Sequence, residues 1–331
     1  MTERKRILSG MRPTGRLHLG NLHGALENWI QLQKEYHCFF FVADWHALTT
    51  DYATPGDILQ NTWEMILDWL SVGLNPELCT MFIQSDIKEH AELYLLLGMI
   101  TPLPWLERNP TYKDLQQQLD TKDLATYGFL GYPVLQAADI IIYKANGVPV
   151  GRDQLPHVEL TREIARRFNF MYNREVFPIP DPLLTEVPVL PGIDGRKMSK
   201  SYNNAIFITE SEETVKEKIS GMLTDYHRVR RSDPGDPELS TVFAYHKLYS
   251  PPSELMEIAE GCRTATMGCV ECKHRLAKNM LEKLRPLREK RVQLEQNMDK
   301  VREIIAVGTG QARDEAIRTM REVREVVGLA S

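Results

Sequence analysis

Residues 197–201 read Lys-Met-Ser-Lys-Ser and form the most distinctive short motif of the chain. Gly192 and Gly195 precede it, which predicts a glycine-hinged loop. On such a loop the ammonium groups of Lys197 and Lys200 can both reach the charge of a polyphosphate. The alternative is an ordinary solvated basic loop, but the match to a phosphate-handling pattern favours nucleotide chemistry.

A second candidate phosphate site lies near the N-terminus. Residues 13–21 read Pro-Thr-Gly-Arg-Leu-His-Leu-Gly-Asn and span the first predicted strand-to-helix turn. A helix N-terminus presents unpaired N–H groups and the positive end of the helix dipole, which favours phosphate. Gly15 and Gly20 would let a nucleotide approach the backbone, and His18 and Asn21 add donors. A turn of this kind is usually only a turn, so the pairing with residues 197–201 carries the hypothesis.

Three polar residues share one face of an apolar helix. Tyr132, Gln136 and Asp139 stand at i, i+4 and i+7, and residues 130–142 are otherwise largely apolar, which predicts a buried helix. A buried carboxylate is costly unless donors surround it. Asp139 therefore accepts either from the protein itself or from an N–H of a substrate. A site of the second kind rejects an analogue without the donor by about 10⁴–10⁵.

The strand predicted at residues 147–151 continues this site. Val148 and Val150 lie on one face of the strand and would form the wall beside an aromatic ring. Asp153 and Gln154 follow its carboxyl end, where ligands bind in open α/β sheets.

The elements that position these residues alternate between strand and helix. Apolar runs predict strands at residues 6–9, 38–43, 79–84 and 147–151, with a fifth at 187–190. Helical spacing begins near residue 18 and recurs over residues 57–72. This alternation predicts an α/β fold, a Rossmann-like doubly wound parallel sheet covered on both faces.

After about residue 205 the pattern becomes purely helical, over residues 215–223, 252–259 and 270–301. We expect a catalytic domain over residues 1–200 and a smaller all-helical module over 201–300. Residues 301–331 are expected to form a C-terminal helix that packs back on the catalytic domain.

Composition narrows the class of protein. The chain has 331 residues and a net charge of −5, and its ordinary composition excludes collagen-like, mucin-like and wholly disordered proteins. No apolar run approaches the roughly 18–20 residues of a membrane span, and the N-terminus has no signal-peptide core. We therefore expect a cytoplasmic protein without membrane contact. Because the net charge is negative, nucleic acid would need a local basic patch.

Residues 273–291 supply such a patch, with eight basic and two acidic side chains. Together with Arg228, Arg230 and Arg231 they form the best candidate surface for RNA phosphates. The alternative is an ordinary solvated helix face.

These motifs together resemble class I aminoacyl-tRNA synthetases. Residues 18–21 and 197–201 carry that resemblance, although the first family motif usually ends in a histidine where this chain has Asn21. Residues 9–15, 132–139 and 148–154 look like the bacterial tryptophanyl-tRNA synthetases in particular. The resemblance runs from residue 6 to about 330. It implies activation of L-tryptophan with Mg-ATP, transfer of the aminoacyl group to tRNA(Trp), and a homodimer.

The resemblance also implies roles for individual residues. Catalytic roles fall on Lys197, Lys200 and His18. The ATP-binding residues would be Arg12, Pro13, Thr14, Gly20, Asn21, Gly151, Arg152, Asp153, Val187, Lys197, Met198, Ser199, Lys200 and Ser201. The tryptophan-binding residues would be Asp139, Tyr132, Gln136, Gln154 and His46. Arg152 departs from the glutamate common at its place, so the resemblance gives it no role of its own.

The cysteines suggest a metal site but do not complete one. Cys262, Cys269 and Cys272 resemble three ligands of a four-cysteine iron–sulfur site found in some family members. The fourth ligand would lie near residues 239–241, which read Leu-Ser-Thr, so we expect no iron–sulfur cluster. Zinc completed by His274 is an alternative, and thiols packed among helices without metal are the expected outcome.

Three other functions compete with this hypothesis. A tyrosyl-tRNA synthetase would share both phosphate motifs, and a buried aspartate could accept a phenol O–H equally well. A nucleotidyl transferase that adenylates a small acid without tRNA would not need the basic helical module. A non-catalytic RNA-binding relative would not need Lys197, Lys200 and His18.

Overall fold

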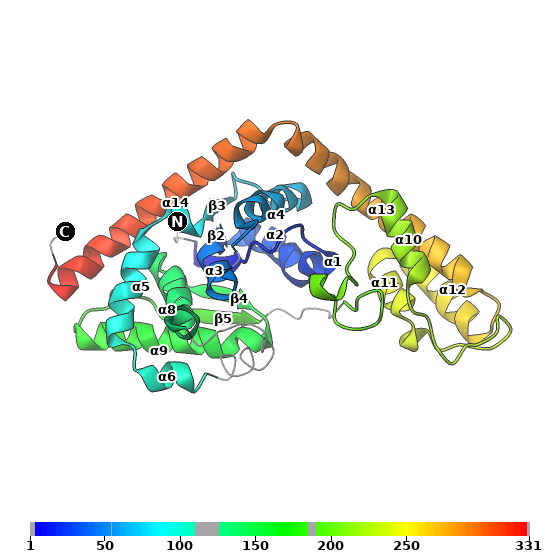
Figure 1. Ribbon diagram of the computed structural model, residues 1–331, viewed down its shortest axis with the longest axis horizontal. Helices are drawn as coiled ribbons and strands as arrows, with labels where there is room; N and C mark the ends of the chain where they lie inside the picture. Colours follow the sequence, from blue (N-terminus) through cyan, green and yellow to red (C-terminus); the bar gives the residue numbers. More distant parts are fainter. Residues whose placement is uncertain (1–3, 54, 110–125, 185–189, 330–331) are drawn as a thin grey trace.

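The computed structural model describes residues 4–53, 55–109, 126–184 and 190–329. Its centre is a five-stranded sheet in the order β3-β2-β1-β4-β5, in which every neighbouring pair is parallel. The strands are β1 (Arg6–Met11), β2 (His37–Val42), β3 (Cys79–Ile83), β4 (Gly147–Val150) and β5 (Asp181–Leu184). This confirms the predicted Rossmann-like sheet (Figure 1).

Helices cover both faces of the sheet because alternate strand residues point to opposite sides. Phe40 belongs to one hydrophobic cluster, whereas Phe39 and Phe41 belong to the other. The first cluster is covered by α1 (Leu19–Asn21), the π-helical turn η1 (Leu22–Leu26), α2 (Glu27–Glu35) and α4 (Ile58–Val72). The second is covered by α5 (Glu89–Ile100), α6 (Leu103–Glu107), α8 (Tyr127–Ile142) and α9 (Leu155–Met171).

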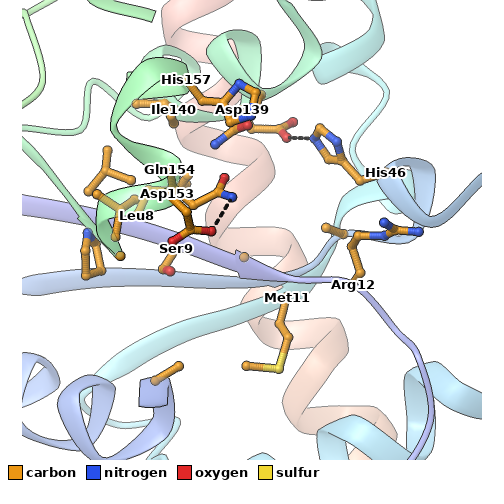
Figure 2. A pocket seen from close by; sticks show the side chains of 18 of the residues that line it. Leu8, Ser9, Met11, Arg12, His46, Asp139, Ile140, Asp153, Gln154 and His157 are labelled. Atoms are coloured by element: carbon orange, nitrogen blue, oxygen red, sulfur yellow. Dashed lines mark hydrogen bonds and ion pairs between the residues drawn. The ribbon is translucent and has the colours of Figure 1, made fainter. Parts of the chain in front are cut away.

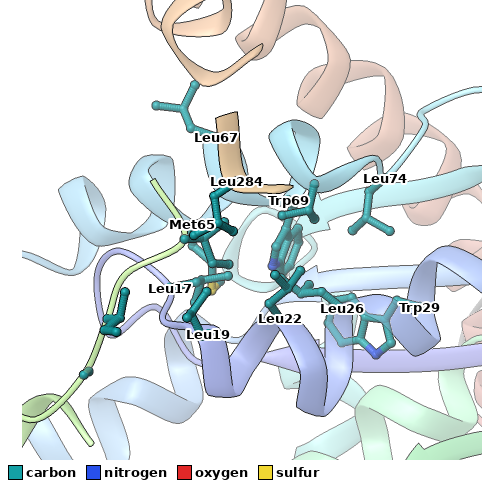
Figure 3. Packing of buried hydrophobic residues seen from close by; sticks show 14 of the residues in the cluster. Leu17, Leu19, Leu22, Leu26, Trp29, Met65, Leu67, Trp69, Leu74 and Leu284 are labelled. Atoms are coloured by element: carbon teal, nitrogen blue, oxygen red, sulfur yellow. The ribbon is translucent and has the colours of Figure 1, made fainter. Parts of the chain in front are cut away.

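Packing of the first crossover fixes the turn that follows β1. Figure 3 shows the leucines of α1 and η1 facing Met65 and Trp69 of α4. The Trp29 ring stacks on Phe40 with 4.4 Å between ring centroids and meets Trp69 edge-on at 5.4 Å. Burial of three large rings against the sheet holds the start of α1 in one place.

Beyond the sheet the chain is helical. The elements are α10 (Glu212–Gly221), η5 (Pro237–Leu239), α11 (Thr241–Tyr249), α12 (Pro252–Arg263) and α13 (Cys269–Glu295). The 27 residues of α13 make a rod of about 40 Å. It packs on α10 and α11 and also on α4, so it joins the helical part to the sheet.

The last helix, α14 (Met298–Val327), returns to the sheet and packs on the outermost strand β3 and on α5. Figure 1 shows α13 and α14 meeting at an angle above the sheet. A Cβ atom on Gly308 would lie 2.0 Å from the carbonyl oxygen of Met81. Only glycine therefore lets α14 approach the backbone of β3 this closely.

Three sequence expectations differ from the structure. The fifth strand is Asp181–Leu184, and residues 187–189 of the expected segment lie outside the described residues. The helical spacing over 270–301 contains two helices, because the chain breaks at Gln296 and Asn297 and α14 already begins at Met298. The first helix is divided by the π-helical turn η1. Over the described residues no helix is both long and apolar enough to cross a bilayer.

Candidate active site

A cavity of about 850 Å³ opens at the carboxyl ends of β1, β2 and β4. These ends meet because parallel strands place them at one edge of the sheet, and α8 borders the same space (Figure 2). Val148 and Val150 line the cavity from β4. Ten of the predicted site residues also line it, namely Arg12, His46, Tyr132, Gln136, Asp139, Gly151, Arg152, Asp153, Gln154 and Lys197.

Asp139 of α8 is fully buried at one side of this cavity. Its Oδ2 atom accepts from His46 Nε2 at 2.8 Å, and its Oδ1 atom accepts from His90 Nδ1 at 2.6 Å. Gln84 Nε2 donates to both oxygens at 2.8 and 2.9 Å. Burial alone would raise the pKa of Asp139, but the bonds from His46 and His90 outweigh it and lower this pKa below its ordinary value.

Tyr132 lies on the same wall and is held by a buried histidine. The Tyr132 hydroxyl is 3.0 Å from His157 Nε2, and Asn109 Nδ2 is 3.2 Å from His157 Nδ1. Burial lowers the pKa of His157 to about 4, assisted by His46, so the ring is neutral at pH 7. With Nδ1 accepting from Asn109, Nε2–H donates to the Tyr132 oxygen. The Tyr132 O–H remains able to donate into the cavity.

The residues after β4 form a short 3₁₀ turn, η3 (Arg152–Gln154), that precedes α9. Arg152 and Asp153 are exposed and Gln154 is half-buried. Gln154 Nε2 donates to Asp153 Oδ2 at 3.1 Å, as Figure 2 shows. This turn presents an amide and a carboxylate to the cavity opposite Asp139.

The N-terminal candidate phosphate loop, residues 13–18, ends in a capping box at the start of α1. His18 Nδ1 accepts from the Asn21 N–H at 3.2 Å, and Asn21 Oδ1 accepts from the His18 N–H at 3.0 Å. Burial, together with the nearby charge of Lys200, lowers the pKa of His18 to about 4. The ring is therefore neutral, and because Nδ1 accepts, the proton sits on Nε2.

The candidate phosphate loop of residues 197–201 lies directly against the N-terminal one. Lys200 Nζ donates to the Thr14 carbonyl oxygen at 2.7 Å, and Met198 Sδ accepts from the Gly20 N–H at 3.4 Å. Burial lowers the pKa of Lys200 to about 8. The Ser199 N–H donates to Asn204 Oδ1 at 2.8 Å. Of the other residues predicted here, Val187 and the side chain of Ser201 lie outside the described part.

A buried ion pair holds the N-terminal loop and the segment that follows residues 197–201. Asp68 of α4 accepts from the Leu17 N–H at 2.7 Å and from Thr209 Oγ1 at 3.3 Å. Arg291 of α13 donates to Asp68 at 2.5 Å, and its side chain is only 4% exposed. Backbone hydrogen bonds join residues 17–19 to residues 206–208, which follow the loop of residues 197–201. The helical part therefore reaches the phosphate loops through Arg291.

Arg12 lies at the mouth of the same cavity. Its guanidinium contacts the Thr50 hydroxyl and lies 3.4 Å from Asp51 Oδ2. Burial lowers its pKa. Pro13, next in the chain, is buried beside it. The structure thus brings the predicted residues of the described part to one cavity and to the two loops at its edge.

Sequence reasoning missed three residues that hold the site, Gln84, His90 and His157. Gln84 directly follows β3, so its place at the carboxyl end of a strand was an available signal. His90 and His157 lie in helices, and nothing in the helical spacing distinguishes them from structural residues.

The three clustered cysteines lie together beside α11, at the start of α13 and the end of α12. Cys262, Cys269 and Cys272 line one cavity of about 20 Å³. Ser240, from the segment where the fourth ligand was expected, lines the same cavity. Burial raises the pKa of Cys272 to about 12, which keeps this thiol protonated. In the part of the chain that the structure describes, no three His, Cys, Asp or Glu residues converge to hold an ion. A four-cysteine cluster would lack one ligand here, because Ser240 stands in the segment where the fourth cysteine would lie.

The basic stretch on α13 divides into structural and exposed residues. Arg291 is buried as described, and Arg288 pairs with Glu212 at 2.8 Å. Lys278, Arg285 and Lys290 are exposed, and within the described ranges none of them makes an ion pair. A hollow of about 550 Å³ at the start of α13 is lined by Arg228, Arg230, Arg231 and His274 among others.

Comparison with known proteins decides the family. The sequence model of the family of class I tRNA synthetases (W and Y) matches residues 1–285 of this chain. This chain belongs to that family. The match covers the sheet, both phosphate loops and most of α13, so the family assignment rests on the whole site and not on one motif.

Within this class I family the relatives are tryptophan enzymes by name. The tryptophan–tRNA ligase of Thermotoga maritima is 54% identical over 98% of this chain and 99% of its own length. That of Aquifex aeolicus is 45% identical, with 98% and 100% covered. The crystal structure of tryptophanyl-tRNA synthetase from Campylobacter jejuni, complexed with ADP and tryptophan, matches with a TM-score of 0.90 and 36% identity over 98% of this chain and all of that one.

Proposed function

We propose that this chain is a tryptophan–tRNA ligase, which activates L-tryptophan with ATP and transfers it to tRNA(Trp) in the cytoplasm. One observation carries the proposal: a single cavity has a donor-surrounded buried carboxylate, Asp139, on one side and two touching phosphate loops at its edge. Full-length relatives that bear this name, at 40–54% identity, support it.

The tryptophan side chain would lie between the two valines of β4 and α8. Asp139 would accept the indole N–H, because it is a carboxylate on the cavity wall and hydrogen bonds to a charged acceptor are strong. Tyr132, Gln136, Gln154 and His46 line the same space and would position the amino acid. A phenol O–H could also reach a carboxylate there, so tyrosine is the competing substrate to exclude.

The phosphate loops would hold the triphosphate from two sides. A tryptophan carboxylate oxygen attacks the α-phosphorus in line, and pyrophosphate leaves. Lys197 and Lys200 would meet the charge on pyrophosphate, while His18, Asn21 and Thr14 hold the phosphates opposite them. No covalent enzyme intermediate is needed, so the protein contributes positioning and charge stabilisation. Mg²⁺ would enter with ATP as part of the substrate and neutralise phosphate charge.

This arrangement implies a rearrangement when ATP binds. Lys200 Nζ donates to the Thr14 carbonyl oxygen, and burial lowers the pKa of Lys200 to about 8. A phosphate oxygen would replace the Thr14 carbonyl as acceptor, which restores a full charge-assisted bond. Gly151 and Asp153, across the cavity, would bind the ribose.

The tRNA anticodon arm would contact the helical part at the start of α13. Arg230 and Arg231 are exposed beside the hollow there, and the start of a helix favours phosphate. Arg288 is paired and is not part of this surface. Reversal of charge at Arg230 and Arg231 should weaken tRNA binding and lower its salt dependence, without changing ATP–pyrophosphate exchange.

A homodimer is proposed as the working form, with α5 at its interface. Leu95 and Met99 are 58% and 71% exposed one turn apart on α5, and Tyr127 of α8 is 72% exposed beside Gly98. A second copy of the chain would cover these apolar side chains.

One assay tests the function. ATP–pyrophosphate exchange is measured with tryptophan and tyrosine side by side, followed by charging of tRNA(Trp). Exchange with tryptophan and charging support the proposal. Exchange with tyrosine alone indicates the tyrosyl enzyme, exchange without charging indicates an adenylating enzyme that does not use tRNA, and no exchange indicates a non-catalytic relative.

A further inference from the structure

Asp139 is held from behind by residues that the cavity does not reach. Its oxygens accept from His46, His90 and Gln84, which together make four hydrogen bonds. His46 and Asp139 line the cavity, whereas Gln84 and His90 are fully buried. A carboxylate offers about four acceptor positions, so a new donor must replace one that is present. The donor from His46 is the one that a molecule in the cavity can replace.

His90 has a second partner deeper in the core. Its Nε2 atom lies 2.6 Å from the hydroxyl of Tyr143, which is also fully buried. The Asp139 carboxylate can only accept from Nδ1, so Nε2 accepts a hydrogen bond from the Tyr143 hydroxyl, which stays protonated because burial raises its pKa well above the ordinary value. Nδ1 must then carry the imidazole proton, and it donates to Asp139 Oδ1. Tyr143, His90 and Asp139 form a directed chain of hydrogen bonds.

The surrounding packing holds this chain in one geometry. His90 lies between the rings of Phe41, Phe82 and Tyr143, with centroid distances of 6.3, 6.2 and 5.4 Å. Neither His90 nor Tyr143 has a role in the activation chemistry proposed above. Burying a polar pair inside an aromatic cluster costs free energy, and the hydrogen bonds of this pair to each other and to Asp139 offset that cost.

We propose that His90, oriented by Tyr143, is a positioning residue for tryptophan recognition: it fixes the Asp139 carboxylate so that an indole N–H can take the place of His46. The inference rests on the proposed function. It predicts that the contribution of the indole N–H to selectivity depends on the Nδ1–H donor of His90, not only on the presence of Asp139.

Two substitutions separate the two nitrogens of His90. The amide nitrogen of asparagine occupies the position of Nδ1, so His90→Asn keeps a donor to Asp139. The amide of glutamine reaches the position of Nε2, so His90→Gln keeps a contact with Tyr143 and loses the donor to Asp139. Tyr143→Phe removes only the hydroxyl that orients the ring.

The readout is the ratio of kcat/KM for tryptophan to that for its benzothiophene analogue, in which sulfur replaces the indole N–H. In ATP–pyrophosphate exchange the wild type should show a ratio of at least about 100. His90→Gln should lower this ratio at least about tenfold, Tyr143→Phe about threefold, and His90→Asn less than about threefold. The KM for ATP should change less than about twofold in all three.

His246 provides the matched control. It is a fully buried histidine of α11, with Ser250 Oγ at 2.6 Å from Nδ1 and the Cys272 carbonyl at 3.0 Å from Nε2. His246→Gln should lower the melting temperature and leave the substrate ratio unchanged. Equal losses for both substrates in His90→Gln, or the same ratio in His90→Asn and His90→Gln, would overturn the inference. If His90→Gln does not fold, an unchanged substrate ratio in Tyr143→Phe would overturn the inference instead.

Failure of the proposed function gives a different result. If the wild-type protein shows no tryptophan-dependent exchange, the proposed function itself is wrong. A wild type that exchanges with tryptophan and discriminates against the analogue, beside variants that discriminate equally well, would remove only the role of His90.

Discussion

Replacing Arg291 by methionine tests how the phosphate loops are anchored. Arg291 is the cation closest to Asp68, a carboxylate with no exposed surface. It also pairs with Glu64 and lies 2.8 Å from Glu295. In Arg291→Met the glutamates can turn toward water, since Glu64 is 28% and Glu295 47% exposed. Asp68 cannot, and among the described residues its side chain keeps hydrogen bonds from the Leu17 N–H and Thr209.

The expected magnitude follows from the burial of Asp68. Removing one partner of a buried ion pair costs about 3–5 kcal/mol of unfolding free energy, because the remaining charge is uncompensated. In Asp68→Asn/Arg291→Met no buried charge remains, and the asparagine oxygen still accepts from the Leu17 N–H. The double variant should therefore lose only about 1–2 kcal/mol. It should be more stable than the Arg291→Met single variant.

Urea unfolding at pH 7, followed by tryptophan fluorescence, measures these differences, because Trp69 lies next to Asp68 in the sequence and in the core. Arg324→Met is the matched control. Its partner Glu92 is 34% exposed, so its loss should cost at most about 1 kcal/mol. A double variant as unstable as Arg291→Met, or a control loss equal to that of Arg291→Met, would refute the argument from burial.

Three further predictions follow from the same structure. Lys200→Ala should lower kcat for exchange by about 10²–10³ and leave the Kd of tryptophan unchanged. In the wild type, kcat/KM for ATP should fall as the pH rises above about 8, where Lys200 loses its proton. In Lys200→Arg, kcat/KM should stay constant to higher pH, because arginine keeps its charge. Gly308→Ala should lower the unfolding free energy by about 1–3 kcal/mol, whereas Gly310→Ala, which meets no atom within 4 Å, should raise it by about 0.5–1 kcal/mol. Met99→Asp should shift the dimer proposed above to monomer in sedimentation, and Met256→Asp, at a site 70% exposed on α12, should not.

The sequence predicts the buried strands well, including β3 at one edge of the sheet, and the exposed edge strand β5 poorly. β2 is a continuous apolar run because both faces of a central strand are covered. β5 reads Asp-Pro-Leu-Leu, with Asp181 and Leu184 exposed, because an edge strand of four residues needs no such run and tolerates Pro182. The break between α13 and α14 falls at Gln296 and Asn297, without glycine or proline to indicate it.

The site divides in the same way. Tyr132, Gln136 and Asp139 reach one wall because helical spacing alone places them there. The donors to Asp139 come from elements far apart in sequence, so no local pattern reveals His90. The charge of Arg291 counts toward a basic stretch in the sequence, yet it serves a buried carboxylate in the fold. Residue type and spacing locate the residues that line the cavity, whereas the groups that hold them depend on tertiary packing.

The position of α14 against β3 has a consequence for synthesis. The outermost strand is made from residues 79–83, and its cover from residues 298–327, more than two hundred residues later. While the ribosome is still translating the helical part, the emerging α/β unit carries a bare parallel strand of the kind that pairs with other chains. Cotranslational folding of this unit therefore stays unfinished until the last helix emerges, and a stalled nascent chain would depend on chaperones to shield that strand.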